Sequence, residues 1–333
     1  MQGSVWREDG LLYVRASLIR AADAQVLWSE RFIEGTQGLS ITGIQEKIAS
    51  QFASRIGQQH GYVLRDVRGT RLDNPNDHSL RGFSCVASAQ IYRRTYHRDE
   101  YPAVRECLEA TVLEDPDYAR ARAMLAYVRN DAARFGHETD LSREAAFDLA
   151  RDAATRALDL DPQDTDALQA MSHVEQYAGD MERSIDYARK AVEVNPNDPA
   201  AVANLAIRYA IAGRFSEAAP TMRRAIDASV APPPFYYHVL TADSLLKKDW
   251  PEMLANADRA AIDGWSFGQA MLAIAHNQLA NTEASKAAFD AMAELDPLLA
   301  NDPRSWLQGH NMHPTVVDAV YEGLAETRAA LSK

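Results

Sequence analysis

Residues 154–205 read ATRALDLDPQDTDALQAMSHVEQYAGDMERSIDYARKAVEVNPNDPAAVANL, and this stretch decides the fold because it nearly repeats itself. Pro162 and Pro196 stand 34 residues apart. Each proline is preceded by one helical pattern and followed by another. Proline lacks an N–H group and disfavours the helical conformation of the residue before it, so both prolines mark helix ends. The stretch therefore predicts a repeated unit of two helices.

Apolar and small residues within the unit recur at helical spacing. The first helix should place Leu168 and Met171 on one face, and the second should bury Ile185 and Ala188. A turn is expected between them at Gly179, because glycine adopts positive φ without strain. Small side chains on both helices would allow the two backbones to approach closely.

The unit resembles the tetratricopeptide repeat, which has a period of 34 residues and two helices per copy. Glu175 departs from the family pattern, which has an aromatic residue there. The matching positions in this copy are Leu168, Met171, Ser172, Ser184, Ala191 and Pro196. The next copy matches at Val202, Leu205, Ala206, Tyr209, Gly213, Ala218, Met222 and Ala225. The resemblance implies a solenoid of stacked helix pairs.

Helical patterns extend this organisation over most of the chain. We predict a mainly α fold, a tetratricopeptide-repeat solenoid of about six helix pairs with a C-terminal cap, preceded by a small α+β segment of three strands and one helix. Pro116 and Pro162 are 46 residues apart, 12 more than one period, so residues 133–139 should form a long loop. The expected domains are an α+β segment (1–60), a linker (61–80), the solenoid (81–300) and the C-terminal cap (301–333).

The N-terminal segment has a different pattern from the repeats. Residues 11–18 alternate in the manner of a strand, Asp9-Gly10 favours a hairpin turn before them, and residues 26–32 read as a third strand. Residues 41–56 carry isoleucines at helical spacing up to Gly57. This β-β-β-α run resembles the second half of the TolB-like N-terminal domain, without its first half. A segment this small buries little apolar area, so we expect it to dock on the first repeat or to pair its exposed edge with another chain.

Composition and charge narrow the function classes. No run of apolar residues is long enough to span a membrane, and the N-terminus has no secretory signal pattern. Residues 101–333 carry 22 lysines and arginines against 36 acidic residues, a net charge that repels nucleic acid. Cys85 and Cys107 are the only cysteines, which favours free buried thiols in a reducing, cytoplasmic compartment.

No catalytic or cofactor-binding pattern occurs in the sequence. A Gly-rich phosphate loop, a nucleophile elbow and paired cysteine motifs are all missing. His310 and His313 form an HxxH pattern, but no third ligand accompanies them and Pro314 breaks any helix there. We therefore predict no catalytic residues, no cofactor and no metal, and interpret this region as a polar loop of the cap.

The remaining place for function is the concave face of the solenoid. The resemblance implies that fixed positions of each first helix line this groove and bind a protein or peptide partner. A groove filled by the chain's own tail or by water is an equally open interpretation. The predicted partner-binding residues are Arg120, Tyr127, Asn130, Asp166, Gln169, His173, Gln176, Ile207, Tyr237, Thr241 and Asn277.

These features lead to three functional hypotheses. The first is a non-catalytic interaction and regulatory module. A TolB-like half followed by repeats resembles the C-terminal arm of bacterial class III adenylate or guanylate cyclases and of winged-helix transcriptional regulators. The second is a free-standing scaffold for complex assembly, and the third is a metal-dependent enzyme. A homo-oligomer formed through the N-terminal strands is compatible with the first two.

Overall fold

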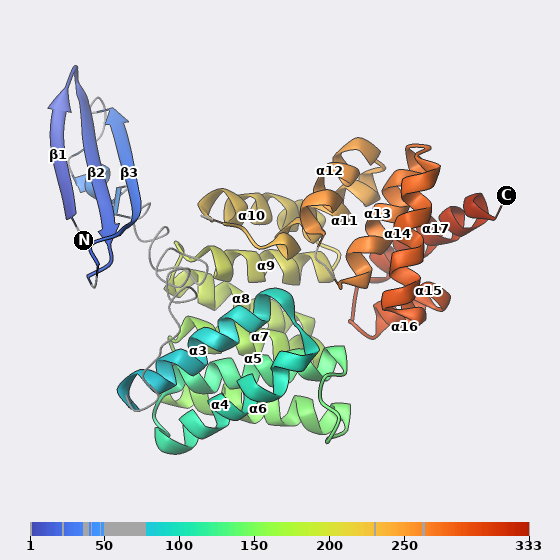
Figure 1. The fold of residues 1–333 in the computed structure, drawn as a ribbon, viewed down its shortest axis with the longest axis horizontal. Coiled ribbons are helices and arrows are strands. Elements are labelled where there is room, and N and C mark those ends of the chain that lie inside the picture. Colours follow the sequence, from blue (N-terminus) through green and yellow to red (C-terminus); the bar gives the residue numbers. More distant parts are fainter. Residues whose placement is uncertain are drawn as a thin grey trace.

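The computed structural model describes residues 2–21, 23–35, 40, 42–46, 48–49, 78–229, 231–261 and 264–332 of the 333-residue chain. An antiparallel sheet forms the N-terminal part, and helix pairs form the rest (Figure 1). The predicted fold class is therefore confirmed. The predicted linker up to residue 77 and the end of the predicted N-terminal helix, from residue 50 to Gly57, lie outside the described residues.

Three strands make up the sheet, in the order β1 (Gln2–Glu8), β2 (Leu11–Ile19) and β3 (Val26–Gly35). Asp9 and Gly10 both have positive φ and connect β1 to β2, as the hairpin signal predicts. Ala16, Trp28 and Phe32 are buried together on one face, and Ile48 packs against them. Every residue of β1 is exposed, and the sheet does not pack on α3 or α4 (Figure 1).

The helices follow one another as antiparallel pairs joined by short turns (Figure 1). Their bounds are α3 (His78–Thr95), α4 (Tyr101–Glu114), α5 (Ala119–Phe135), α6 (Arg143–Leu160), α7 (Thr165–Tyr177), α8 (Met181–Val194), α9 (Pro199–Ile211), α10 (Phe215–Ala228), α11 (Tyr237–Lys247), α12 (Trp250–Ala260), α13 (Ser266–Gln278) and α14 (Thr282–Leu295). Three shorter or terminal helices complete the chain: α15 (Pro297–Asn301), α16 (Pro303–Gln308) and α17 (Pro314–Leu331).

Local sequence explains the helix ends. The carboxylates of Asp164, Asp180 and Asp198 accept hydrogen bonds from backbone N–H groups in the first turns of α7, α8 and α9. Gly179 follows α7 with a φ of 86°, which residues other than glycine rarely adopt. Both the turn and the helix end before Pro196 agree with the sequence prediction.

The α5–α6 pair corrects the expected loop. The prediction placed an extended loop at residues 133–139, but α5 continues to Phe135 and the connection spans residues 136–142. The 12 extra residues mainly lengthen the two helices, because Ala132 and Ala133 are buried and keep the helical pattern going. Ser142 caps α6 as expected, since its Oγ accepts from Ala145 N at 3.2 Å.

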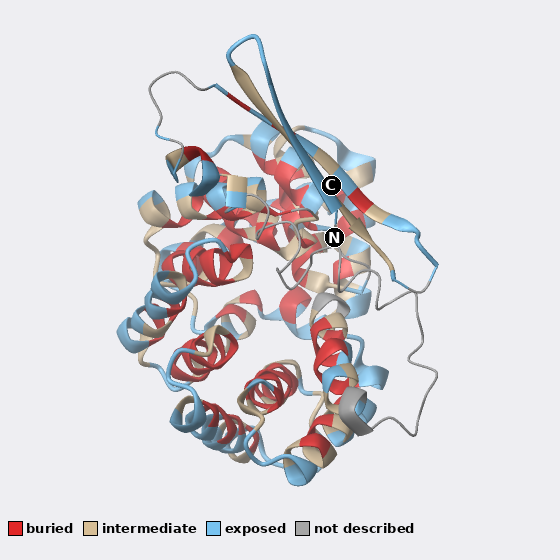
Figure 2. Ribbon diagram, turned by 90° about the vertical axis from the view of Figure 1, so that its left-hand side faces the viewer, coloured by how far each residue is buried: buried red, intermediate tan, exposed pale blue. Residues whose placement is uncertain are grey.

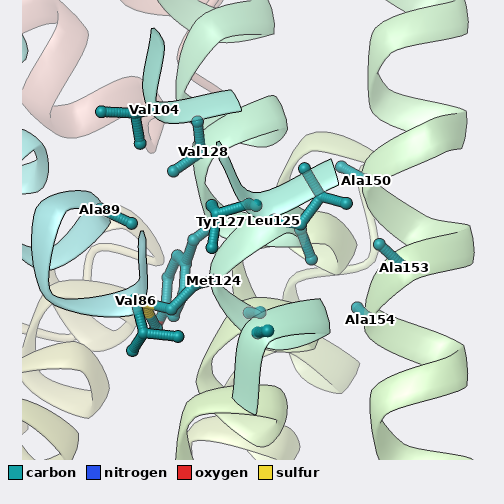
Figure 3. Close-up of a cluster of buried hydrophobic side chains, with 14 of the residues drawn as sticks. Val86, Ala89, Val104, Met124, Leu125, Tyr127, Val128, Ala150, Ala153 and Ala154 are labelled. Carbon is teal, nitrogen blue, oxygen red and sulfur yellow. The ribbon is translucent and has the colours of Figure 1, made fainter. Parts of the chain in front are cut away.

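Each helix pair buries small and medium apolar side chains against its neighbours. Figure 2 shows buried residues on the helix sides that face other helices and exposed residues on the outside. In α7–α8, Ser184 Oγ donates to Ser172 O at 2.6 Å, and in α13–α14 Ser285 Oγ donates to Ala273 O at 2.9 Å. Small residues at these two equivalent contacts hold each pair closely together. Figure 3 shows part of the core around α5, with Met124, Leu125, Tyr127 and Val128.

Cys85 of α3 and Cys107 of α4 form a disulfide, with their Cα atoms 5.5 Å apart. The expectation of free thiols is therefore wrong. The cysteine count could not reveal this bond, because it depends on how closely α3 and α4 pack. The predicted cytoplasmic location loses the support that it drew from free thiols.

The C-terminal helices cover the end of the solenoid, as solenoid ends require. Val317, Val320 and Leu324 of α17 are buried in one cluster with residues of α13. Gly323 lies so close to α13 that an added Cβ would come within 2.9 Å of Ile274 Cγ2. None of the helices that the structure describes combines the length and the apolar character needed to cross a membrane.

Candidate functional site

A cavity of about 190 Å³ lies on the inner side of the solenoid. The first helices of successive pairs, α3, α5, α7, α9, α11 and α13, all contribute residues to its wall. Residues near the C-terminus, from Trp306 to Val316, complete the wall. We call this cavity the central cavity and residues 306–316 the closing segment.

The closing segment reaches across to the middle repeats through polar contacts. Gln176 Nε2 donates to His310 O at 3.0 Å, and Asn311 Nδ2 donates to Gln176 O at 2.7 Å. The backbone N–H of His313 donates to Ile211 O at 2.8 Å, and Arg143 Nη2 donates to Gly309 O at 2.9 Å. The chain's own tail therefore covers part of the groove, which the sequence left open as one of two interpretations.

Aromatic side chains bring the first two helix pairs and the last helix pair together. The Trp265 ring lies 5.9 Å from the ring of Tyr96 and 5.7 Å from that of Phe135, both in edge-to-face geometry. Trp306 stacks on Phe267 at 5.6 Å. These contacts form a largely apolar side of the central cavity.

Another part of the cavity wall is polar and positively charged. Arg93 and Arg134 both pair with the fully buried carboxylate of Asp131, at 3.0 and 3.2 Å. The guanidinium of Arg93 also lies 3.5 Å from the ring centre of Tyr127. One carboxylate therefore holds two arginines in place against the cavity wall.

Arg208 of α9 is the third arginine of this wall and is 1% exposed. It donates to Gln176 Oε1, and its Nη2 lies 3.3 Å from His173 Nε2. Burial lowers the pKa of Arg208 to about 10, because the charged form loses its hydration. Across the described part of the chain, no carboxylate forms an ion pair with Arg208.

Three histidines at the cavity wall are held in the neutral state. Burial lowers the pKa of His238 and of His310 to about 4 and lowers that of His173 well below its usual range. The positive charges of Arg208 and Arg93 lower the pKa of His173 further. The wall therefore carries its positive charge on arginines at neutral pH.

Five of the eleven predicted partner-binding residues line the central cavity. They come from three successive first helices, α5, α7 and α9. The five residues are Tyr127, Gln169, His173, Gln176 and Ile207. Whether they bind a partner stays a prediction, but the family spacing does bring them to one wall.

The other six predicted residues lie elsewhere. Arg120 is half-exposed and pairs with the buried Asp166 at 3.1 Å. Asn130 is fully buried, and Thr241 is buried with its hydroxyl donating to Tyr237 O at 2.9 Å. Asn277 lies in α13, partly buried. All six residues belong to helices that line the cavity, but none of them lines it.

Sequence reasoning missed the arginines and the aromatic side of the cavity. Arg208 follows the predicted Ile207 by one position, and the family spacing passes over it. Trp265 and Trp306 belong to turns and short helices outside the repeat pattern. The sequence could not show that Trp265 meets Tyr96 and Phe135, because that contact depends on the curvature of the whole solenoid.

The HxxH pattern does not form a metal site in the structure. His310 Nδ1 lies 2.9 Å from Trp306 O, and the His313 side chain accepts from Thr315 N to cap α17. Within the described ranges, no three His, Cys, Asp or Glu side chains gather to hold a metal ion.

Comparison with known proteins supports the fold. Residues 165–198 match the family model of the tetratricopeptide repeat. The APC/C hetero-tetramer Cut9–Hcn1 superposes with a TM-score of 0.53 at 13% identity, over 89% of this chain and 56% of that chain. No curated protein matches the sequence significantly.

Two further solved structures have TM-scores below 0.5. PilF of Pseudomonas aeruginosa has a TM-score of 0.47 at 12% identity, covering 68% of this chain and 98% of that chain. A tetratricopeptide repeat protein from Parabacteroides merdae has a TM-score of 0.46 at 11% identity, covering 85% and 98%. At such identities only the fold is comparable. The helical region thus has a tetratricopeptide-repeat-like solenoid fold, and residues 165–198 of this chain match one such repeat.

Proposed function

We propose that this chain is a non-catalytic interaction module that holds a protein or peptide partner on the inner side of its solenoid. The observation that carries the proposal is that the first helices of successive pairs contribute to one inner side, and that Arg120, Tyr237 and Asn277 on these helices stay partly exposed. Stacked helix pairs present an extended inner surface, and solenoids commonly use such a surface for binding. The solved relative in the APC/C hetero-tetramer is itself part of a protein assembly.

Part of the inner side stays accessible beyond the closing segment. Arg120, Tyr237 and Asn277 are partly or half-exposed on first helices near the cavity. We expect a partner to contact these residues, since they can be reached without displacing residues 306–316.

Chemical cross-linking and capture with the immobilised full chain tests this proposal. The test variant carries Arg120→Ala, Tyr237→Ala and Asn277→Ala. The matched control carries three alanines at the exposed outer positions Glu193, Arg224 and Glu294. Partners retained by the wild type and the control but lost by the inner-side variant support the proposal. Equal retention by both variants contradicts it.

A finer form of the proposal makes the chain the regulatory arm of a bacterial signalling protein, either cyclase-like or a transcriptional regulator. It rests on the resemblance of the N-terminal segment to half a TolB-like domain. The exposed strand β1 supports it, because β1 pairs on one side only within the described sheet and Val5 is exposed. The other edge of β1 suits pairing with a second chain or with a preceding domain.

The rival is a free-standing scaffold. Reading the coding DNA upstream of Met1 separates the two, because an in-frame cyclase or winged-helix domain supports the regulatory arm and a stop codon supports the scaffold. Sedimentation of the Val5→Lys variant tests the strand edge, since a charge there should dissociate any homo-oligomer formed through β1.

A further inference from the structure

The charge of the central cavity is opposite to that of the whole chain. The formal net charge of the protein is −12, yet Arg93, Arg134 and Arg208 line the cavity and no Asp or Glu among the described residues does. Asp131 lies behind this wall and offsets one of the three positive charges. The cavity therefore has a net positive charge that the surrounding side chains leave uncompensated.

Arg208 is the arginine whose positive charge is left uncompensated. Removing a guanidinium from water costs several kcal/mol unless an anion or a full set of acceptors replaces the water. Among the described residues, Arg208 has only the neutral side chains of Gln176 and His173 as partners, and its Nε lacks an acceptor. A buried charge of this kind is costly for stability alone, which indicates that it serves to bind something.

The polar atoms beside Arg208 also need an acceptor. His173 Nε2 faces Arg208 Nη2, so its proton is assigned to Nδ1, which has no hydrogen-bond partner in the part of the chain that the structure describes. Gln169 Nε2 is likewise buried without a partner. Arg208 Nε, His173 Nδ1 and Gln169 Nε2 are all donors. Three unpaired donors at one wall call for a ligand with oxygen acceptors and a negative charge.

The aromatic part of the cavity wall sets the shape of the ligand. Trp265, Phe267 and Trp306 present aromatic surface, and Phe235 and Met312 add apolar surface. An apolar cavity of about 150 Å³ accommodates one benzene molecule. The 190 Å³ of this cavity is thus on the scale of a single aromatic ring system with a short polar arm.

We propose that the central cavity binds a small aromatic carboxylate. Its carboxylate lies against Arg208, Gln169 and His173, and its ring lies among Trp265, Phe267 and Trp306. A planar carboxylate fits a guanidinium through two parallel hydrogen bonds. This site does not depend on the proposed partner, because the capture experiment above changes residues outside the cavity wall.

Isothermal titration of the full chain with two isosteric probes tests the proposal. Indole-3-acetate carries the negative charge, and indole-3-acetamide has the same ring and arm without it. We expect the acid to bind at least about tenfold more tightly than the amide. Equal affinities, or no binding of the acid at millimolar concentration, overturn the proposal.

Two matched variants test whether Arg208 causes the preference for the acid over the amide. Arg208→Met removes the buried guanidinium, and Arg224→Met makes the same change on the exposed side of α10. We expect Arg208→Met to bind the acid and the amide alike, and Arg224→Met to keep the wild-type preference. An unchanged preference in Arg208→Met contradicts the assignment. The comparison of acid with amide on the wild type needs no variant, so the proposal stays falsifiable if Arg208→Met fails to fold.

Discussion

The α7–α8 pair and the closing segment are both held against the solenoid, but through contacts of different range. Ile185 and Ala188 of α8 pack with residues of the next pair, within one repeat length along the chain. The closing segment instead contacts Gln176 and Arg143, which are more than 130 residues away in sequence. The comparison teaches that neighbouring pairs build the solenoid, whereas a few distant polar and aromatic contacts shape its cavity.

Truncation of a core residue in the repeats should have the largest effect. Ile185→Ala removes a fully buried side chain and leaves a cavity, so we expect the free energy of unfolding to fall by about 2–5 kcal/mol. Chemical denaturation measures it. Glu193→Ala on the exposed side of the same helix serves as the control and should change stability by less than about 0.5 kcal/mol. Similar losses in both variants would show that α8 is not packed as described.

The difference in the sequence range of the contacts also explains which features the sequence could predict. Pro162, Gly179 and Pro196 are local signals, and helix ends, turns and fold class follow from them. Tyr127, Gln169 and Ile207 could be assigned to one wall because each repeat places them by the same spacing. The sequence could not predict the contacts of Trp265 and Trp306, because these depend on the curvature of the solenoid. It could not predict the Cys85–Cys107 bond either, because that bond depends on the packing of two divergent helices.

The first helix pair differs from the others by its disulfide, which gives the second prediction. The bond closes a loop with a sequence separation of 22 residues, so reducing it should lower the free energy of unfolding by about 3 kcal/mol. Denaturation with and without dithiothreitol measures the effect. Cys107→Ser should lose the dependence on the reductant. A wild-type stability that is the same with and without dithiothreitol would contradict the bond.

Acidification should lower the free energy of unfolding, because the histidines at the cavity wall are neutral in the folded state. The folded-state pKa values of His238 and His310, about 4, lie below the usual value, so the unfolded chain binds protons first as the pH falls. The stability that they contribute is present above pH 6.5 and is lost toward pH 4. Burial raises the pKa of Asp198 to about 6 and also raises the pKa of Asp164, and both shifts act in the opposite direction. We expect a net loss of about 2 kcal/mol between pH 7 and pH 4.5.

Denaturation at a series of pH values measures this dependence. His238→Phe keeps a ring beside Trp265 and should flatten the profile. A stability that rises as the pH falls from 7 to 4.5 would show that Asp198 and Asp164 outweigh the histidines.

A comparison of two glycine-to-alanine variants distinguishes the contact made by the closing segment from backbone strain. Gly213 and Gly136 both have positive φ, but a Cβ on Gly213 would come within 2.6 Å of the His313 ring, whereas one on Gly136 would meet nothing within 4 Å. Gly136→Ala should cost about 1 kcal/mol from strain alone, and Gly213→Ala should cost about 1 kcal/mol more. Thermal unfolding of the two variants compares them. Equal losses would mean that His313 does not lie against Gly213.

The position of residues 306–316 across the inner side of the solenoid is the central claim, and hydrogen–deuterium exchange tests it most directly. The N–H of His313 donates to Ile211 O, so a peptide covering this segment should exchange slowly, at a rate near that of α9. Gly213→Ala should speed its exchange while leaving α7 and α8 protected. Exchange of the segment within seconds in the wild type would contradict the position of residues 306–316 across the inner side.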